Sequence, residues 1–457
     1  MIQKRIFSLT LAQILLASGV LVLTGQTPAY AGTKTFEVNR VGDAADLDTA
    51  GSACDTSGKA GVQCTLRAAI MEANATPGSD LIIFKIPGAG RHTITPESDL
   101  PAITESVTIN GYTEPGASPN TRKKGTNAKL MIAIDGENAG PDATGLLLDN
   151  VNGAVIRGLV IKDFRVGGGA GGHGIRLSGT SSGNRIQGNF IGTNFAGTAS
   201  EGNSMGVWVG GSENMVGGTS RAVRNLISGN TAHGVLVASV GGTAEDNDVR
   251  GNLIGLAKNA SADVGNADHG VFILFSSGNR VAANSIAFNG GDGVSTEGLS
   301  HSRNHVMGNS IYFNVGMGID LGNDGRTLND VDNPGDADDT DTGANNKQNY
   351  PEILTASTDE DGITTVVGEL SSTGNESPDT SNEFTVRLFS NPPDTAEGKK
   401  LIATLAITDS SHEPAMFIVS GPRVALGNTI TATATDAQGS TSEFSDPRFV
   451  RRPGGAN

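Results

Sequence analysis

Short apolar phrases that begin with a glycine recur along the middle of the chain. They are GIRL, GVWV, GVLV, GVFI, GVST and GIDL, starting at Gly174, Gly206, Gly234, Gly270, Gly293 and Gly318. Most of them alternate apolar side chains as a strand with one buried face does. Successive phrases start 23 to 36 residues apart. Repeats of this length built from short strands are typical of a solenoid.

A second phrase, two asparagines five positions apart with an apolar residue between them, alternates with the first. The pairs are Asn184/Asn189, Asn225/Asn230, Asn247/Asn252, Asn279/Asn284 and Asn304/Asn309. An asparagine at the same bend of successive coils can bond the backbone above and below it, and it tolerates a left-handed conformation. We therefore predict one structural ladder made of Asn189, Asn230, Asn252, Asn284 and Asn309.

These repeats predict a parallel β-helix over residues 80–325. Each repeat holds two or three short apolar strands separated by Gly, Asn or Ser turns. A propeller would need long hairpins and a leucine-rich repeat would need periodic leucines, and the sequence has neither pattern. We expect an all-β chain whose stacked coils bury Val, Ile and Leu between them.

One helix is predicted ahead of the repeats. Leu66, Ala69, Ile70 and Ala73 have the spacing of a single apolar helical face, and Thr65 suits the N-cap position. A helix here would cover the open apolar end of the first coil. A partner-binding helix is the alternative. We assign residues 32–79 to an N-terminal cap that also holds a strand and a loop.

The pattern changes again after residue 349. Segments such as GITTVVGEL, EFTVRLFS and KLIATLAIT read as longer alternating strands with turns between them. This spacing predicts a β-sandwich domain over residues 350–450, followed by a tail at residues 451–457.

The first 31 residues have the pattern of a secretory signal peptide. A basic start at Lys4 and Arg5 precedes a mostly apolar run, and Ala29-Tyr30-Ala31 is a small-x-small cleavage site. An uncleaved anchor is the alternative. We expect export to the periplasm, the cell surface or the medium, with no transmembrane anchor in the mature chain.

The charge of the chain excludes one class of partner. The formal net charge is −16, and removing residues 1–31, which hold two basic and no acidic residues, changes it to −18. Binding to phosphates needs Lys and Arg gathered on one face, and no basic cluster is present. We therefore expect no nucleic-acid partner.

Cys54 and Cys64 are expected to form a disulfide. An even, close pair of cysteines in an exported chain is most simply a bonded pair. Such a bond would close a small loop and stabilise it by ~2–3 kcal/mol. A metal or redox site is the other interpretation, but no histidine lies nearby and the spacing is not CxxC.

An acidic stretch, residues 326–349, separates the repeats from the sandwich. By composition it is a solvated linker. Its alternating aspartates also suit Ca²⁺, which takes about six to eight oxygen ligands, so calcium is the one cofactor that the sequence suggests. The candidate ligands are Asp330, Asp332, Asp336, Asp338 and Asp341.

The start of the predicted helix, Cys64-Thr-Leu-Arg-Ala-Ala-Ile70, resembles the CSLREA motif, with Thr65 in place of Ser and Ala68 in place of Glu. With GYTEPGAS, RGLVIKDF, QGNFIGTNFAGTASEGN and RNLISGN, it makes residues 33–450 similar to bacterial right-handed parallel β-helix proteins that carry this motif. The resemblance implies a right-handed coil. The wider pectate-lyase-like superfamily includes lyases, glycosidases, adhesins and phage tailspikes, so the resemblance specifies fold more than function.

Candidate functional residues gather in one column of the repeats. His173, in a GHG fragment like that of polygalacturonases, and Asp163 are the candidates for catalysis, although the aspartate motifs of those enzymes do not precede them. The residue before each strand-starting glycine is His173, Met205, His233, His269, Asp292 or Met317. Recurring histidines there indicate a ladder at a turn, with a metal or glycan contact as the other interpretation. The candidate binding residues are His233, His269, Trp208 and Arg176.

Two functions are consistent with this sequence. The first is a non-enzymatic protein that binds glycans or surfaces, with extracellular or cell-wall polysaccharide as its partner, because a solenoid joined to a sandwich carries no complete catalytic set. The alternative is a polysaccharide lyase or glycoside hydrolase acting on acidic polysaccharide. That alternative rests on analogy of fold and requires carboxylates that converge in one groove.

Overall fold

The computed structural model describes residues 32–50, 53–169, 171–238, 244–299, 301–329, 342–372, 382–393, 395–409 and 414–454. The predicted signal peptide, residues 1–31, lies outside this part of the chain. The described residues form one α-helix, many short strands and four 3₁₀ helices. The 3₁₀ helices are η1 (Gly111–Thr113), η2 (Gly136–Asn138), η3 (Arg221–Val223) and η4 (Ala344–Lys347).

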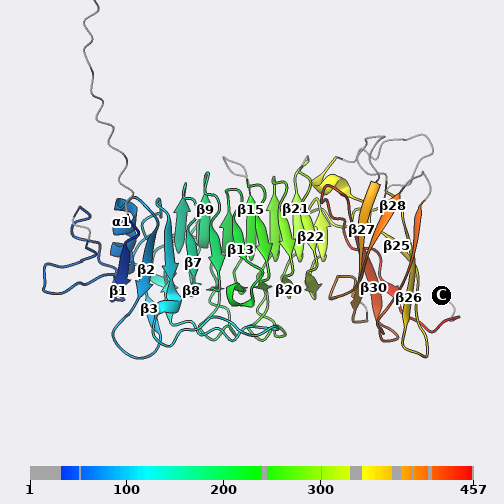
Figure 1. Cartoon of the computed structure of the whole chain (residues 1–457), viewed down its shortest axis with the longest axis horizontal. Helices are drawn as coiled ribbons and strands as arrows, with labels where there is room; N and C mark the ends of the chain where they lie inside the picture. Colours follow the sequence, from blue (N-terminus) through cyan, green and yellow to red (C-terminus); the bar gives the residue numbers. More distant parts are fainter. Residues whose placement is uncertain are drawn as a thin grey trace, which may run out of the picture. The chain divides into compact units, whose positions relative to one another are not determined.

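Three parallel sheets wind into a right-handed β-helix, and each complete coil gives one strand to each sheet (Figure 1). Sheet A contains β1 (Thr35–Val38), β2 (Asp80–Phe84), β4 (Val107–Asn110), β7 (Val155–Arg157), β10 (Arg185–Gln187), β13 (Met215–Gly217), β16 (Asp248–Arg250), β19 (Arg280–Ala282) and β22 (His305–Met307). Sheet B contains β3 (His92–Ile94), β5 (Ile132–Asp135), β8 (Leu159–Lys162), β11 (Phe190–Ile191), β14 (Leu226–Ile227), β17 (Leu253–Ile254), β20 (Ser285–Ala287) and β23 (Ser310–Tyr312). Sheet C contains β6 (Leu146–Asp149), β9 (His173–Ser178), β12 (Met205–Val209), β15 (Val235–Ala238), β18 (Val271–Leu274), β21 (Val294–Glu297) and β24 (Ile319–Leu321).

The core of the β-helix lies between the three sheets and is filled by one inward row from each. In sheet A this row runs through Ile156, Ile186, Val216, Val249, Val281 and Val306. β-branched side chains suit such a stack because they fit a pleated surface and lose few rotamers there. The fold predicted from the apolar pattern, an all-β parallel β-helix, is confirmed.

Buried asparagines at the bends form three ladders. Each asparagine accepts a hydrogen bond from the backbone of the preceding coil with its side-chain oxygen, and most donate the side-chain NH₂ to a carbonyl of that coil. The first ladder is Asn184, Asn214, Asn247, Asn279, Asn304 and Asn345. The second is Asn189, Asn225, Asn252, Asn284 and Asn309. The third is Asn203, Asn230, Asn266, Asn289 and Asn314.

The predicted ladder was wrong at Asn230. Four of the five predicted residues share the second ladder, but Asn230 belongs to the third, and Asn225 takes its place. A step of five residues joins the first bend to the second in one coil and the second bend to the third in another. The Asn225/Asn230 pair is therefore displaced by one bend, which spacing alone does not reveal.

The α-helix α1 (Leu66–Ala75) covers the first coil. Its N-cap is Thr65, as predicted, and the Thr65 side chain accepts the N–H of Ala68 at 3.1 Å. The helix contacts β1 and β2. The sequence assigned β1 to the cap, but β1 pairs in parallel with β2 and is the first strand of sheet A. Cys54 and Cys64 form a disulfide beside the start of α1.

The C-terminal strands form two antiparallel sheets, consistent with the predicted β-sandwich. One sheet contains β25 (Glu352–Thr358), β26 (Thr364–Leu370) and β29 (Ala415–Gly421). The other contains β28 (Lys400–Asp409), β27 (Asn382–Asn391), β30 (Thr429–Thr435) and β31 (Arg448–Phe449). Phe384, Leu388, Phe417 and Ile430 are buried in the core of these strands.

Side chains that follow the repeats complete the bends of the last coil. Asn345, inside the predicted linker, accepts the N–H of Asn304 at 2.9 Å. Glu397, which follows β27, accepts hydrogen bonds from the N–H of Phe313, from the N–H of Asn314 at 3.2 Å and from the side-chain NH₂ of Asn314 at 2.8 Å. These bonds satisfy the N–H groups of Asn304, Phe313 and Asn314 at the last bends, as buried polar groups require.

Candidate functional site

The outer face of sheet C gathers five of the six predicted catalytic and binding residues. Along each strand of this sheet alternate side chains enter the core, so the residues between them face outward. One outward row is Arg176, Trp208, Leu236 and Phe272, in register on adjacent strands. The column of residues before the strand-starting glycines lies beside this row, because the His173 ring contacts Trp208 and the His233 and His269 rings contact Phe272. The candidates placed together are His173, Arg176, Trp208, His233 and His269.

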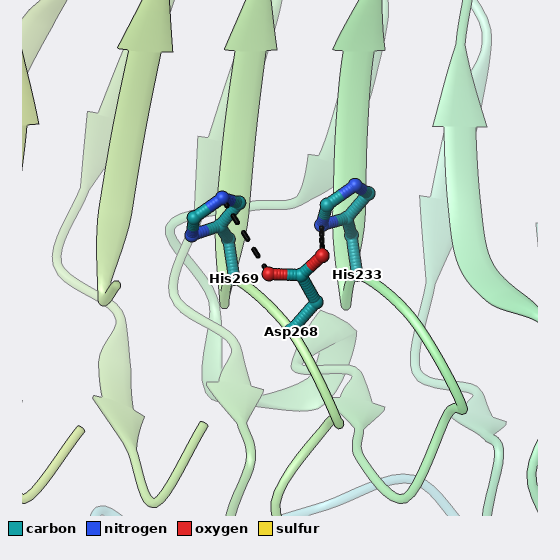
Figure 2. Close-up of side chains that lie close together, drawn as sticks. All are labelled: His233, Asp268 and His269. Carbon is teal, nitrogen blue, oxygen red and sulfur yellow. Dashed lines mark ion pairs between the residues drawn. The ribbon is translucent and has the colours of Figure 1, made fainter. Parts of the chain in front are cut away.

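Two histidines and one aspartate converge at the centre of this face (Figure 2). The rings of His233 and His269, on successive coils, stack with their centroids 5.3 Å apart and an interplanar angle of 3°. Asp268 reaches between them, with Oδ2 3.6 Å from His233 Nδ1 and Oδ1 3.5 Å from His269 Nε2. One donor atom from each of the three residues lies within 4.8 Å of the others. Among the described residues no other trio of His, Cys, Asp or Glu is grouped in this way.

The surroundings of the two imidazoles differ. Burial lowers the pKa of His233, and the charge of Asp268 opposes this only in part. Burial would also lower the pKa of His269, but Asp292 and Asp268 raise it above its ordinary value. The Nδ1 atom of His269 lies 3.1 Å from Oδ2 of Asp292 and 2.9 Å from the Asp292 backbone nitrogen. Asp292 therefore fixes the ring of His269 so that Nε2 faces Asp268.

This trio has the character of a metal site. Imidazole nitrogens with one carboxylate suit Zn²⁺, Cu²⁺ or Ni²⁺. His233 Nδ1 has no hydrogen-bond partner among the described residues, and it faces the Asp268 carboxylate, as does His269 Nε2. The ring nitrogen of a metal-bound histidine that does not bind the metal usually contacts a carboxylate. Asp292 is in this position, beside Nδ1 of His269. Three ligands would leave coordination positions open to water or a second ligand.

His173 lies at one end of the same face, and its environment argues against acid–base catalysis. Its side chain is buried, and burial, aided by the charge of Arg176, lowers its pKa to about 4. The ring meets Trp208 edge-on with centroids 5.0 Å apart. The guanidinium of Arg176 lies 4.4 Å from the centre of the Trp208 ring. These three residues form an aromatic and cationic surface instead of a proton-transfer site.

Asp163 lies away from this face, at the end of β8 in sheet B. Lys162 Nζ bridges Asp135 at 2.8 Å, Asp163 at 2.9 Å and Glu201 at 2.8 Å. Lys162, Asp135 and Glu201, but not Asp163, border a cavity of about 340 Å³ that Phe195 also lines. The pKa of Asp163 is lowered because hydrogen bonds from Lys162 and Arg165 outweigh burial. The pKa of Lys162 is raised by its carboxylate partners. Neither group is suited to exchange a proton near neutral pH, as a general acid or base must.

The predicted calcium ligands lie outside the described residues. They are Asp330, Asp332, Asp336, Asp338 and Asp341. Asp268 and the contact of Asp292 with His269 were not predicted from the sequence. The signal for Asp268 was present, since it directly precedes a histidine of the column.

The fold and this face define a parallel β-helix protein with a histidine–carboxylate cluster. Residues 130–352 match the sequence model of the family described as "Periplasmic copper-binding protein (NosD)". This match supports a periplasmic or extracellular location. Within the described residues, no helix has the length and apolar character needed to cross a membrane. No sequence among curated proteins matches the chain significantly.

Several solved structures resemble the chain at low identity. The periplasmic alginate epimerase AlgG is 15% identical over 56% of this chain and 59% of its own, with a TM-score of 0.32. The cedar-pollen allergen Jun a 1 is 14% identical over 66% and 82%, with a TM-score of 0.32. Tailspike protein gp49 of Acinetobacter baumannii bacteriophage Fri1, a capsular polysaccharide depolymerase, is 9% identical over 80% of each chain, with a TM-score of 0.19. The chain thus spans less than two thirds of AlgG.

Proposed function

We propose that this exported β-helix protein is a non-enzymatic binding protein that holds a transition-metal ion, with Cu²⁺ as the first candidate, between His233, Asp268 and His269. The observation that carries the proposal is the convergence of one donor atom from each residue within 4.8 Å. Stacked coils make this possible, because in-register neighbours in a parallel sheet place equivalent side chains about 4.8 Å apart.

Copper is favoured over other ions by two arguments. For a given nitrogen and oxygen donor set, Cu²⁺ binds most tightly of the common divalent first-row ions. The three residues also fall inside residues 130–352, which match a family described as copper-binding. The family description supports the ion, and the geometry supports the residues.

A copper titration of the mature protein tests the proposal. We expect one tight Cu²⁺ equivalent in calorimetry, with nitrogen couplings in its electron paramagnetic resonance spectrum. The double variant His233→Ala/His269→Ala should lose this equivalent, and Asp268→Asn should weaken it by at least about tenfold. His301→Ala is the matched control, since His301 lies outside the trio. Equal copper binding by the wild type and the double variant would refute the site.

A second function, glycan binding on the same outer face, is favoured by the Arg176–Trp208 pair. An aromatic ring offers a flat apolar surface to the C–H face of a sugar, and a guanidinium beside it can bond a sugar carboxylate in two places. Affinity electrophoresis in gels containing pectin or alginate should retard the wild-type protein, and Trp208→Ala should abolish the retardation. Unchanged migration of the wild type in all acidic polysaccharides would contradict this function.

Neither of the two residues predicted to be catalytic has the protonation behaviour that a lyase or hydrolase needs. His173 is neutral near pH 7, and Asp163 is held by Lys162 and Arg165. We therefore expect no unsaturated product and no new reducing ends when the protein is incubated with pectin or alginate. Turnover that a single substitution on sheet B or sheet C abolishes would overturn the non-enzymatic assignment.

A further inference from the structure

An open cavity of about 340 Å³ lies on the outer face of sheet B, towards the N-terminal end of the β-helix (Figure 1). Part of its lining comes from β3, β5 and β8, which are neighbours in this sheet. The rest comes from Arg91, directly before β3, and from residues 194–196 and 201, in the loop between β11 and β12. The volume falls within the range of small-molecule sites, about 300–1,000 Å³, so the cavity is large enough for a small ligand.

The charged side chains of this lining balance one another. Arg91 and Lys162 are its cations, and Asp135 and Glu201 are its anions. Because the two signs occur in equal number, neither an anionic nor a cationic ligand gains a net Coulomb attraction to the cavity. The lining is therefore suited to a neutral ligand that both donates and accepts hydrogen bonds.

Lys162 occupies the place that a metal ion would take among these carboxylates. Its Nζ atom lies 2.8 Å from Asp135, 2.9 Å from Asp163 and 2.8 Å from Glu201. An ammonium group has three N–H donors, and three carboxylate contacts use all of them. Lys162 therefore fixes the two carboxylates of the lining, whose remaining lone pairs can accept hydrogen bonds from a ligand.

Three hydrogen-bonding groups of the lining have no partner among the described residues. The Arg91 guanidinium lies over the Phe195 ring, 4.9 Å from its centre, and makes no hydrogen bond or ion pair there. The Thr93 hydroxyl and the side-chain NH₂ of Asn194 also have none. Asn194 is nevertheless held in place, because its side-chain oxygen accepts the N–H of Thr198 at 3.1 Å. The cavity therefore offers positioned donors beside the carboxylate acceptors.

We propose that this cavity binds a neutral hexose unit. The hydroxyl groups of the sugar donate to the carboxylates of Asp135 and Glu201 and accept from the N–H groups of Arg91 and Asn194. The apolar C–H groups of the sugar ring contact Phe195, as in other sites where an aromatic side chain supplies apolar surface beside polar groups. This site is separate from the histidine trio and from the Arg176–Trp208 pair, both of which lie on sheet C.

A uronate, the acidic form of a hexose, is the competing ligand. Its carboxylate would pair with Arg91, as arginine does with carboxylates in general. However, Asp135 and Glu201 line the same cavity and repel a negative charge. A hexoside and the uronide that differs from it only at C6 therefore separate the two ligands, and the proposal requires that the uronide binds no more tightly than the hexoside.

Saturation-transfer NMR titrations of the mature protein test this ligand class. The probes are the methyl glycosides of glucose, galactose and mannose and the three matching methyl uronides. We expect at least one neutral glycoside to bind with a dissociation constant of about 10⁻³ M, as befits a small ligand in an open site, and its uronide to bind no more tightly. Absence of binding by all three neutral glycosides overturns the proposal, and so does tighter binding of the uronides.

Variants of the lining locate the binding site. Arg91→Ala should weaken binding of the neutral glycoside about tenfold and Thr93→Val about threefold, because each removes hydrogen bonds to the sugar. Both side chains are exposed and lack partners among the described residues, so both variants should fold. Arg185→Ala, at an exposed arginine of sheet A, is the matched control. Trp208→Ala should also keep the affinity, which separates this site from glycan binding on sheet C. Unchanged affinity in Arg91→Ala and Thr93→Val, or its loss in Trp208→Ala, overturns the proposal.

Discussion

The smallest unit that determines this structure is the buried asparagine. Asn189 illustrates it: the side-chain oxygen accepts the N–H of Leu159 at 3.0 Å, and the NH₂ group donates to the carbonyl of Ile156 at 2.9 Å. Both backbone groups belong to the preceding coil and are out of reach of water. One side chain therefore satisfies a donor and an acceptor that the bend would otherwise leave unpaired.

Asn189→Ala should destabilise the β-helix by about 2–4 kcal/mol, because it leaves a buried N–H and a buried C=O without partners. The midpoint of urea unfolding, followed by circular dichroism, measures the change. Asn259→Ala is the control, since Asn259 is exposed and its side chain bonds only its own turn. Equal midpoints for the two variants would show that the ladder is not a source of stability.

At the proposed copper site the residue with the least obvious role is Asp292. It contacts Nδ1 of His269 but offers no atom to the trio itself. Asp292→Asn should lower Cu²⁺ affinity by about 10–100-fold. The neutral amide would neither orient the His269 ring nor increase its basicity as the carboxylate does. A competition titration against a chelator measures this. Asp248→Asn on sheet A is the control, and an Asp292→Asn variant of wild-type affinity would contradict the role.

At the scale of elements, the sequence predicted which secondary structures form. It predicted less well which bend of a coil each repeated residue occupies. Alternating apolar residues after each glycine sufficed for the strands of sheet C, and the Thr65 cap sufficed for α1. The ladder assignment failed at Asn230 because two different bends share one spacing. The histidine column was visible in the sequence as a repeat. Asp268 was not predicted, because it precedes the strand and the direction of its side chain depends on how the coils stack.

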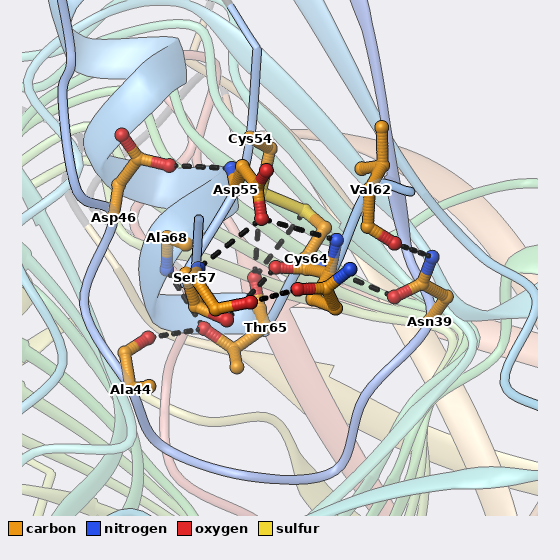
Figure 3. The surroundings of a disulfide bond; sticks show 12 residues. Asn39, Ala44, Asp46, Cys54, Asp55, Ser57, Val62, Cys64, Thr65 and Ala68 are labelled. Atoms are coloured by element: carbon orange, nitrogen blue, oxygen red, sulfur yellow. Dashed lines mark hydrogen bonds between the residues drawn. A yellow bond between two sulfur atoms is a disulfide. The ribbon is translucent and has the colours of Figure 1, made fainter. Parts of the chain in front are cut away.

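The disulfide should stabilise the N-terminal cap by linking the loop to the start of α1 (Figure 3). Replacing both Cys54 and Cys64 by Ala removes this link and should cost ~2–3 kcal/mol of stability. The midpoint of urea unfolding, compared between the oxidised protein and the double variant, measures the change. Equal midpoints would show that the loop is ordered without the bond.

At the scale of the whole chain, the β-helix is closed by a different device at each end. The first coil is covered by α1, and the last coil bonds to side chains of the C-terminal strands. Glu443, which follows β30, is buried and accepts the N–H groups of Leu321 at 3.0 Å and Thr327 at 3.1 Å. Open ends are where solenoids fray or associate, so such closure favours an isolated chain.

This closure should depend on pH. Burial raises the pKa of Glu443 from 4.5 to about 7, although both backbone N–H groups oppose the shift. Between these two values the folded state binds more protons than the unfolded state, so stability falls as pH rises. The unfolding free energy of the C-terminal strands should therefore be lower at pH 8 than at pH 5.5. Urea titrations at both values measure it.

Glu443→Gln supplies the control for this dependence. The amide does not ionise, so the variant should show a smaller difference between the two pH values than the wild type. Part of the difference should persist, because burial also raises the pKa of Glu397, which bonds to the last coil. If Glu443→Gln shows the full wild-type dependence of stability on pH, Glu443 is not its cause.

The ladders also give the β-helix a direction, like a polymer that grows from one end. Each asparagine completes the coil before it and leaves its own N–H for the asparagine of the coil after it. A chain that emerges N-terminus first can therefore add one finished coil at a time, and propagation of this kind suits repeat structures. A ladder of this kind must end at the last coil. The third ladder ends at Asn314, which bonds to the carboxylate of Glu397. The Glu397 carboxylate accepts the backbone N–H and the side-chain NH₂ of Asn314 but, unlike an asparagine amide, has no NH₂ group to donate onward, so the side-chain series ends there.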